Sequence, residues 1–324
     1  MQDEKLAISF WPWGLFDTCG NGIYHNCDLK MKETAERGFN CVRMESGAGL
    51  FCSPDGVPRG KIQLNPPFGK FSKLIRQMNT LRQGGLCDIK DRLLNIFQAA
   101  DHYGIKIILS SWFFLHTNWF LGDEINNPIF ALSTKEKIFY FADELNRILS
   151  FLQQNCLIHC VAFAEIFNEF DGLPFSGEYH AWEPSHEEAA LLRKWHEDAV
   201  DKLKADHPDI LFAYDSSSPD IIGELIPQNI DILNFHSYFM WPVYNLFEQG
   251  MISWEASEPE IPESTAKFLK MELRTADIIK EIGKPLMTGR GWATRVRLYA
   301  DIDETKLKRL ECLLQQELEK NQEK

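Results

Sequence analysis

The stretch that decides the fold is Ile158–Gly172, IHCVAFAEIFNEFDG. It begins as an apolar, strand-like run and ends in an amide and a carboxylate, Asn168 and Glu169. Removing such groups from water costs free energy, so a buried strand that ends in them is unusual. In a parallel α/β barrel, the carboxyl ends of the strands form the face on which active sites are built. The run therefore predicts a barrel strand that carries Asn168 and Glu169 to that face.

Short apolar runs alternate with longer segments of helical periodicity along the whole chain, which predicts a parallel sheet. No glycine-rich turn follows the first run, which counts against a dinucleotide-binding fold. We therefore predict an α/β fold, a (β/α)8 barrel, as a single domain over residues 1–324. The strands are expected at residues 6–10, 39–44, 105–111, 159–166, 210–214, 231–235 and 285–288.

Helix-starting patterns lie between these strands. Ser133 and Ser185 are each followed three residues later by a glutamate, Glu136 and Glu188, the pattern of a capping box. The helices are expected at residues 28–37, 89–103, 134–154, 186–205, 264–281 and 304–319.

The eighth strand is irregular or missing in this pattern. After the seventh strand come residues 293–300, a helix and a charged end. Either residues 294–299 substitute for the eighth strand, or the barrel stays open. Because an open barrel exposes strand edges, pairing of two copies through that edge is a third, structural hypothesis for the function.

The composition excludes several classes of partner. Lys and Arg number 34 and Asp and Glu 47, a net charge of -13 that disfavours nucleic acids and anionic membranes. The chain has no basic segment followed by an apolar one at its start, so we expect a cytoplasmic location. Its eight cysteines form no CxxC pair and are expected to be reduced, with no metal and no cofactor.

Five motifs occur in the order of the expected strands. They are Gly38–Arg43 (GFNCVR), Tyr103–Leu109 (YGIKIIL), Glu165–Glu169 (EIFNE), His236–Tyr238 (HSY) and Gly283–Gly289 (GKPLMTG). Together they resemble the retaining, cellulase-like glycoside hydrolases, in particular the family-5-like and the sugar-binding cellulase-like proteins. The resemblance covers about residues 6–292 and implies a (β/α)8 barrel that handles carbohydrates.

The resemblance also implies roles for individual residues. Glu169 would be the general acid/base, and Asn168 would bind the sugar 2-hydroxyl. Arg43 would lie beside the nucleophile and keep it ionised. His236 and Tyr238 would line the same pocket. Tryptophans near strand ends would stack on sugar rings, and the two that we single out are Trp112 and Trp292.

One departure from the family pattern changes the expected function. Arg290 stands where the resemblance expects the nucleophilic glutamate, and a guanidinium cannot attack a sugar carbon. Retaining hydrolysis needs two carboxyl groups about 5–5.5 Å apart. Glu45 or Glu255 could replace the missing carboxylate in an inverting mechanism. Arg43 and Arg290 could instead clamp an anionic sugar such as a uronate.

Three functions therefore follow from the sequence. The first is sugar binding with weak or altered hydrolysis. The second is an active glycoside hydrolase that uses a relocated carboxylate, and the third is assembly through the open barrel edge. Whether the protein is an enzyme is left open by the sequence.

Overall fold

The computed structural model describes residues 6–11, 14–16, 24–64, 85–112, 121–170, 185–216, 223–236, 283 and 286–290. The chain divides into two compact units, which are described separately. Unit 1 comprises Met1–Asn168, Leu173–Tyr214 and Leu225–Asp231, and unit 2 comprises Glu169–Gly172, Asp215–Glu224 and Ile232–Lys324. The single domain expected over residues 1–324 stays a prediction.

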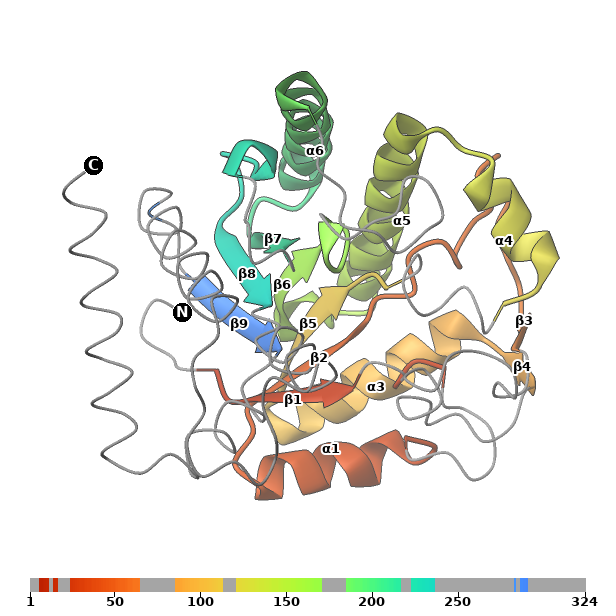
Figure 1. Cartoon of the computed structure of the whole chain (residues 1–324). Coiled ribbons are helices and arrows are strands. Elements are labelled where there is room, and N and C mark those ends of the chain that lie inside the picture. The colour runs from red at the N-terminus through yellow and green to blue at the C-terminus, as the bar shows by residue number, and fades with distance from the viewer. Residues whose placement is uncertain are drawn as a thin grey trace, which may run out of the picture. The chain divides into compact units, whose positions relative to one another are not determined.

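Five parallel strands form the sheet of unit 1 (Figure 1). Every residue of the second, fourth and fifth of them is buried. Strands buried on both faces are typical of parallel sheets covered by helices, and this explains their near-continuous apolar sequences. In sheet order the strands are β1 (Ile8–Trp11), β2 (Cys41–Glu45), β5 (Lys106–Ser110), β6 (Val161–Glu165) and β7 (Phe212–Ser216), whose last two residues belong to unit 2.

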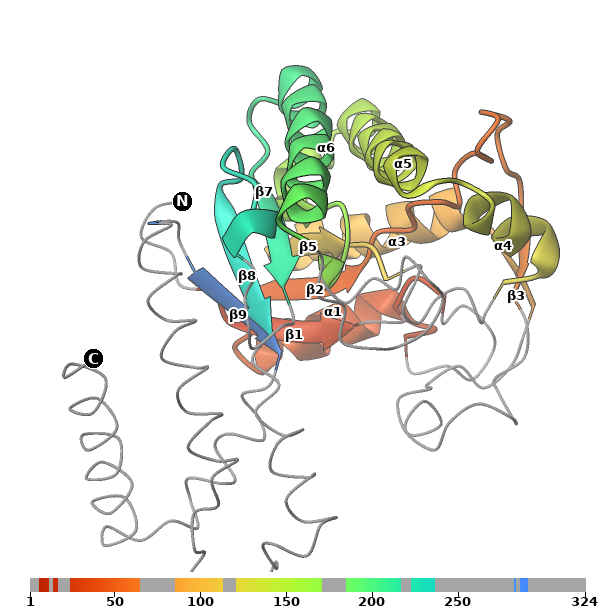
Figure 2. The ribbon, with the colours of Figure 1, turned by 45° about the horizontal axis from the view of Figure 1, so that its top comes forward.

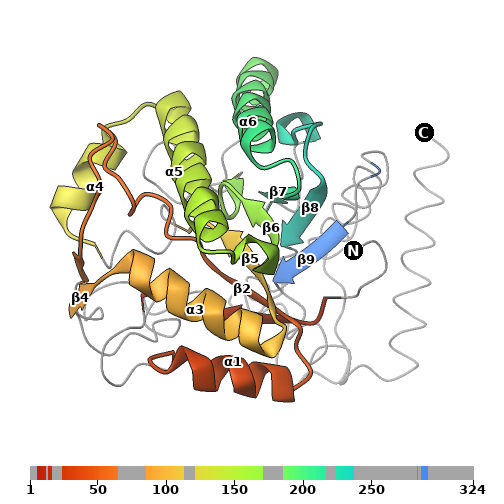
Figure 3. The same cartoon turned by 180° about the vertical axis from the view of Figure 1, so that it is seen from behind.

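Helices alternate with these strands. They are α1 (Cys27–Glu36), α3 (Ile89–Tyr103), α4 (Asp123–Phe130), α5 (Thr134–Gln154) and α6 (His186–Asp206). The helices α1 and α3 pack side by side, as do α5 and α6 (Figures 2 and 3). Two short 3-10 helices, η3 (Ile158–Cys160) and η5 (Gly223–Leu225), precede β6 and β8 (Ile232–His236), respectively.

Local signals in the sequence set the ends of the long helices. The predicted capping boxes at Ser133 and Ser185 are both present. At the start of α3 the Asp88 side chain accepts hydrogen bonds from two backbone amides. The same helix ends at Gly104, whose φ of 67° lies in the left-handed region that favours glycine. No helix among the described residues has the length and apolarity needed to cross a membrane.

The long connection after β2 carries a small second sheet. In it β3 (Ile62–Leu64) pairs antiparallel with β4 (Gly85–Cys87). Strands of three residues are too short to show an alternating pattern, so the sequence did not predict them. It also missed α4, an eight-residue helix that contains Pro128.

Unit 2 contains a parallel pair of strands, β8 (Ile232–His236) and β9 (Leu286–Arg290). The register places the last residues of the two strands opposite each other, His236 beside Arg290. The Asn234 side chain donates a hydrogen bond to Asp215 over 3.2 Å. The expected helices at 264–281 and 304–319 and the substitute strand at 294–299 lie outside the described residues, so closure and edge pairing stay predictions.

All seven predicted strands are present, each within two residues of its expected ends. The four predicted helices that fall on described residues are confirmed as well. The alternation of parallel strands and helices confirms the α/β prediction.

Candidate functional site

The carboxyl ends of β2, β5 and β6 gather a buried group around one guanidinium, which we call the arginine cluster. It consists of Arg43, Ser110, Trp112, Glu165 and Asn168. One nitrogen of Arg43, Nη2, donates to Glu165 Oε2 over 2.6 Å, and to Ser110 Oγ and Asn168 Oδ1 over 3.1 Å each. The guanidinium carbon lies 4.7 Å from the centre of the Trp112 ring.

The arginine cluster carries a large desolvation cost, because both of its charged groups are removed from water. The side chains of Arg43 and Glu165 are 0% exposed. Buried ions keep their charge only when they are paired and hydrogen-bonded, as these are. The flat face of Trp112 gives the cation a further attractive contact. We infer that the ion pair fixes the geometry at the ends of β2 and β6.

Asn168 is oriented by this pair. Its Oδ1 accepts from Arg43, and its backbone amide donates to the carbonyl of Ser111 over 2.8 Å. The side chain is 1% exposed, yet Nδ2 has no hydrogen-bond partner among the described residues. An unsatisfied buried donor costs free energy, so its presence calls for a functional explanation.

Glu169 has an unusual backbone. Its φ is 56°, in the left-handed region that non-glycine residues avoid, and it is 3% exposed. Cys156 is the other described non-glycine residue with such a φ, and it follows the end of α5, where left-handed residues commonly end helices. Glu169 follows no helix. Strained backbone of this kind gathers at functional sites.

Glu45, at the end of β2, is a buried and fully engaged carboxyl group. Its Oε2 accepts from the Trp112 amide over 2.6 Å, and its Oε1 accepts from the Gly47 amide over 3.0 Å and the Ser46 hydroxyl over 3.4 Å. Burial raises the pKa of Glu45 to about 8, although these hydrogen bonds act in the opposite direction. The contacts tie β2 to the residue after β5, which favours a structural role for Glu45.

The pKa of Glu45 predicts a pH dependence of stability. A folded pKa above the unfolded one gives stability that is present below pH 4.5 and is lost as pH rises through 8. From pH 5 to pH 7 we expect the wild type to lose about 2–3 kcal/mol relative to Glu45→Gln. Urea unfolding of both proteins at the two pH values measures this. An equal change in the free energy of unfolding of the wild type and Glu45→Gln between the two pH values would contradict the raised pKa of Glu45.

The structure places the remaining predicted residues as follows. Trp112 is 1% exposed and contacts both Arg43 and Phe10, and its stacking on a sugar stays a prediction. His236 and Arg290 end β8 and β9. Three predicted residues lie outside the described residues: Tyr238, Glu255 and Trp292.

Sequence reasoning missed Glu165 as the partner of Arg43. A signal was present, because Glu165 interrupts an apolar run on a strand expected to be buried, where a carboxylate needs a cation. The strands β2 and β6 both flank β5, and Ser110 is the register partner of Glu165. Because β2 and β6 lie on either side of β5, Arg43 and Glu165 come within contact distance although they are far apart in the sequence.

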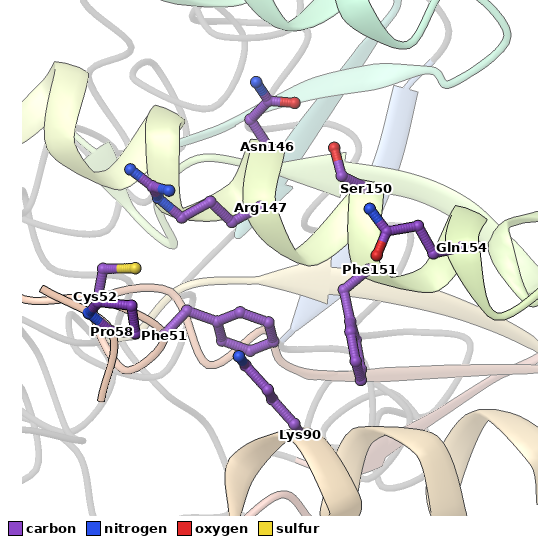
Figure 4. Close-up of a pocket in the computed structure, with 9 residues that line it drawn as sticks. All are labelled: Phe51, Cys52, Pro58, Lys90, Asn146, Arg147, Ser150, Phe151 and Gln154. Carbon is purple, nitrogen blue, oxygen red and sulfur yellow. The ribbon is translucent and has the colours of Figure 1, made fainter. Parts of the chain in front are cut away.

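A cavity of about 420 Å³ lies elsewhere in unit 1 (Figure 4). Glu144 of α5 accepts hydrogen bonds from the backbone amides of Phe51 and Cys52, two residues that line the cavity, and so fixes their position. No residue of the arginine cluster lines this cavity, so it is separate from the strand-end site. Its lining residues are Phe51, Cys52, Pro58, Lys90, Asn146, Arg147, Ser150, Phe151 and Gln154.

Parallel strands that carry buried, charged side chains at their carboxyl ends are typical of α/β-barrel proteins. In such proteins the functional site lies at that face of the sheet. Within that class the chain belongs to the sugar-binding cellulase-like family, whose model matches residues 7–255. The family establishes a cellulase-like, glycoside-hydrolase-type fold. A search of curated proteins finds no match.

One solved structure aligns well enough to show a shared fold, and two others align less closely. A "putative glycoside hydrolase" from Parabacteroides distasonis aligns with a TM-score of 0.62 at 20% identity, over 89% of this chain and 76% of that one. An endo-1,4-beta-D-mannanase from Thermotoga petrophila aligns at 0.46 and 16% identity, over 87% and 77%. A family 5 mannosidase from Rhizomucor miehei aligns at 0.46 and 13%, over 87% and 67%. The fold is of the cellulase-like α/β type, as predicted, while closure of the (β/α)8 barrel stays a prediction.

Proposed function

We propose that this protein binds carbohydrate through the residues at its strand ends and hydrolyses glycosides weakly or not at all. The observation that carries the proposal is Arg290 at the last position of β9. The family resemblance expects the nucleophilic carboxylate there, and a guanidinium cannot perform that step. Glycoside hydrolysis by the retaining route requires that second carboxylate.

Sugar binding is supported by Asn168 and Glu169. Asn168 keeps a buried amide donor without a partner among the described residues, and a ligand hydroxyl would satisfy it. Glu169 follows directly with strained backbone, as groups held ready for a ligand often do. Their positions in the sequence match the family motif E-I-x-N-E.

A neutral sugar is the better candidate than a uronate. The uronate hypothesis needs Arg43 as one half of an anion clamp. Arg43 is 0% exposed, and its Nη2 already contacts Glu165, Ser110 and Asn168. Only a displaced Glu165 would release this cation, at a large cost in free energy.

Binding and turnover separate the candidate functions. We expect calorimetry with neutral oligosaccharides to show binding, and Asn168→Ala to weaken it about tenfold, because one buried hydrogen bond is lost. Aryl glycosides should show no turnover above background. Arg290→Glu, which supplies the expected carboxylate, should raise turnover, whereas the matched variant Arg290→Gln should not.

Two results would overturn this proposal. Clear hydrolysis by the wild type that falls about 10²–10⁴-fold in Glu169→Gln would identify an active enzyme with a relocated carboxylate. Absence of binding to every neutral and uronate-containing glycan tested would remove the sugar ligand itself. Asp198→Asn, a change on the exposed face of α6, serves as the control for both assays.

A further inference from the structure

A second cluster of chemically reactive side chains lies at the amino end of β6. Asp101 comes from the last turn of α3, while His159 and Cys160 form the end of η3. Their side-chain ligand atoms lie within 4.8 Å of one another. Five residues of extended strand separate Cys160 from Glu165, roughly 17 Å. The cluster is therefore distinct from the arginine cluster.

The contacts within this cluster converge on one nitrogen. His159 Nε2 lies 2.7 Å from Asp101 Oδ1 and 3.5 Å from Cys160 Sγ, and the sulfur lies 3.9 Å from the same Asp101 oxygen. A nucleophilic Cys-His-Asp relay would use the two different ring nitrogens of the histidine. Because Nε2 serves both neighbours here, the arrangement does not fit a relay. It fits three ligand atoms that face one point.

We propose that Asp101, His159 and Cys160 form a binding site for a zinc ion. Carboxylate oxygen, imidazole nitrogen and thiolate sulfur are the ligands zinc takes in proteins. Tetrahedral bonds of about 2.0–2.3 Å set the ligand atoms about 3.3–3.6 Å apart. The two distances to sulfur, 3.5 and 3.9 Å, lie close to these values, and the oxygen–nitrogen distance must open by about half an ångström.

The surroundings leave room for an ion and hold the ligands in place. The side chains of Asp101 and His159 are 51% and 54% exposed, so a water molecule can fill the fourth position. Cys160 is 2% exposed, at the start of a buried strand. Lys106 donates to the carbonyl of His159 over 2.8 Å, and the amide of Cys160 donates to that of Leu157 over 3.0 Å. These bonds fix the η3 turn that presents both ligands.

Zinc binding here would be coupled to loss of a proton. Zinc binds cysteine as the thiolate, so the thiol of Cys160 must give up its proton on binding. The ion binds the thiolate, and the thiol proton passes to solvent. Zinc affinity should therefore rise with pH.

The test is zinc titration of the full chain against a chromophoric competing chelator. We expect one zinc ion per chain, and Cys160→Ser, His159→Gln and Asp101→Asn to weaken binding at least tenfold each. Cys156→Ser and His102→Gln are matched controls, since both side chains are exposed and lie next to the site in sequence. Both should bind zinc as the wild type does.

Cobalt provides a readout that depends on the sulfur itself. Bound cobalt(II) should show a sulfur-to-metal charge-transfer band in the wild type and in Cys156→Ser, and none in Cys160→Ser. The two variants at exposed positions, His159→Gln and Asp101→Asn, keep the test valid should Cys160→Ser fold poorly. Sub-stoichiometric zinc binding, or equal affinity in wild type and all three ligand variants, would overturn the proposal.

Discussion

Replacing Glu165 with Gln should destabilise the folded protein by about 3–5 kcal/mol. The change keeps the size of the side chain and removes only its charge. It leaves Arg43, which is 0% exposed, as a buried cation that has lost its ion pair with the Glu165 carboxylate. Because the interior cannot solvate that charge as water does, the folded state bears the full desolvation cost.

Urea unfolding at neutral pH measures this loss. The control is Asp198→Asn, which breaks the ion pair with Lys194 at the same distance, 2.6 Å, but on the surface. With side chains 66% and 43% exposed, that pair should contribute less than about 1 kcal/mol. Combining Arg43→Met with Glu165→Met should cost less than the single change Glu165→Gln. Equal losses for Glu165→Gln and Asp198→Asn would contradict the assignment of a buried pair.

The second large effect concerns acid stability and His196 of α6. Burial lowers the pKa of His196 to about 3, and its ring packs against Tyr214 and Phe167. Between pH 6.5 and pH 3 the unfolded chain therefore binds a proton that the folded chain does not. By linkage, stability rises with pH across this window and is lost as pH falls through it, by about 5 kcal/mol in all.

Urea unfolding at pH 6.5 and pH 4.5 tests this expectation. The wild type should lose about 2 kcal/mol more than His196→Phe over this interval, because phenylalanine cannot take up the proton. His102→Gln, at an exposed position of α3, should behave as the wild type does. Glu45 and Glu144, whose pKa values burial raises, have the opposite pH dependence in all three proteins and cancel in the comparison. An unchanged acid response in His196→Phe would show that the ring is protonated in the folded state.

The sequence predicted the elements whose signals are local. The capping boxes at Ser133 and Ser185 and the apolar run before Asn168 each depend on residues within a few positions of one another. The same local logic failed for β3, β4 and α4, which are too short to show a period. The strand expected at residues 285–288 is confirmed as β9, which ends at Arg290, and the nucleophile position that the family resemblance gives to Arg290 stays a prediction.

The sequence alone thus determined the alternation of strands and helices, the family motifs and the position of Asn168 and Glu169 at a strand end. Only the tertiary structure decided which charged side chains pair with each other. Arg43 pairs with Glu165 across 122 residues, and His159 meets Asp101 across 58. Pairings of this kind depend on which strands and helices become neighbours, because electrostatic attraction acts through space and buried charges accept only the partners that packing brings within reach.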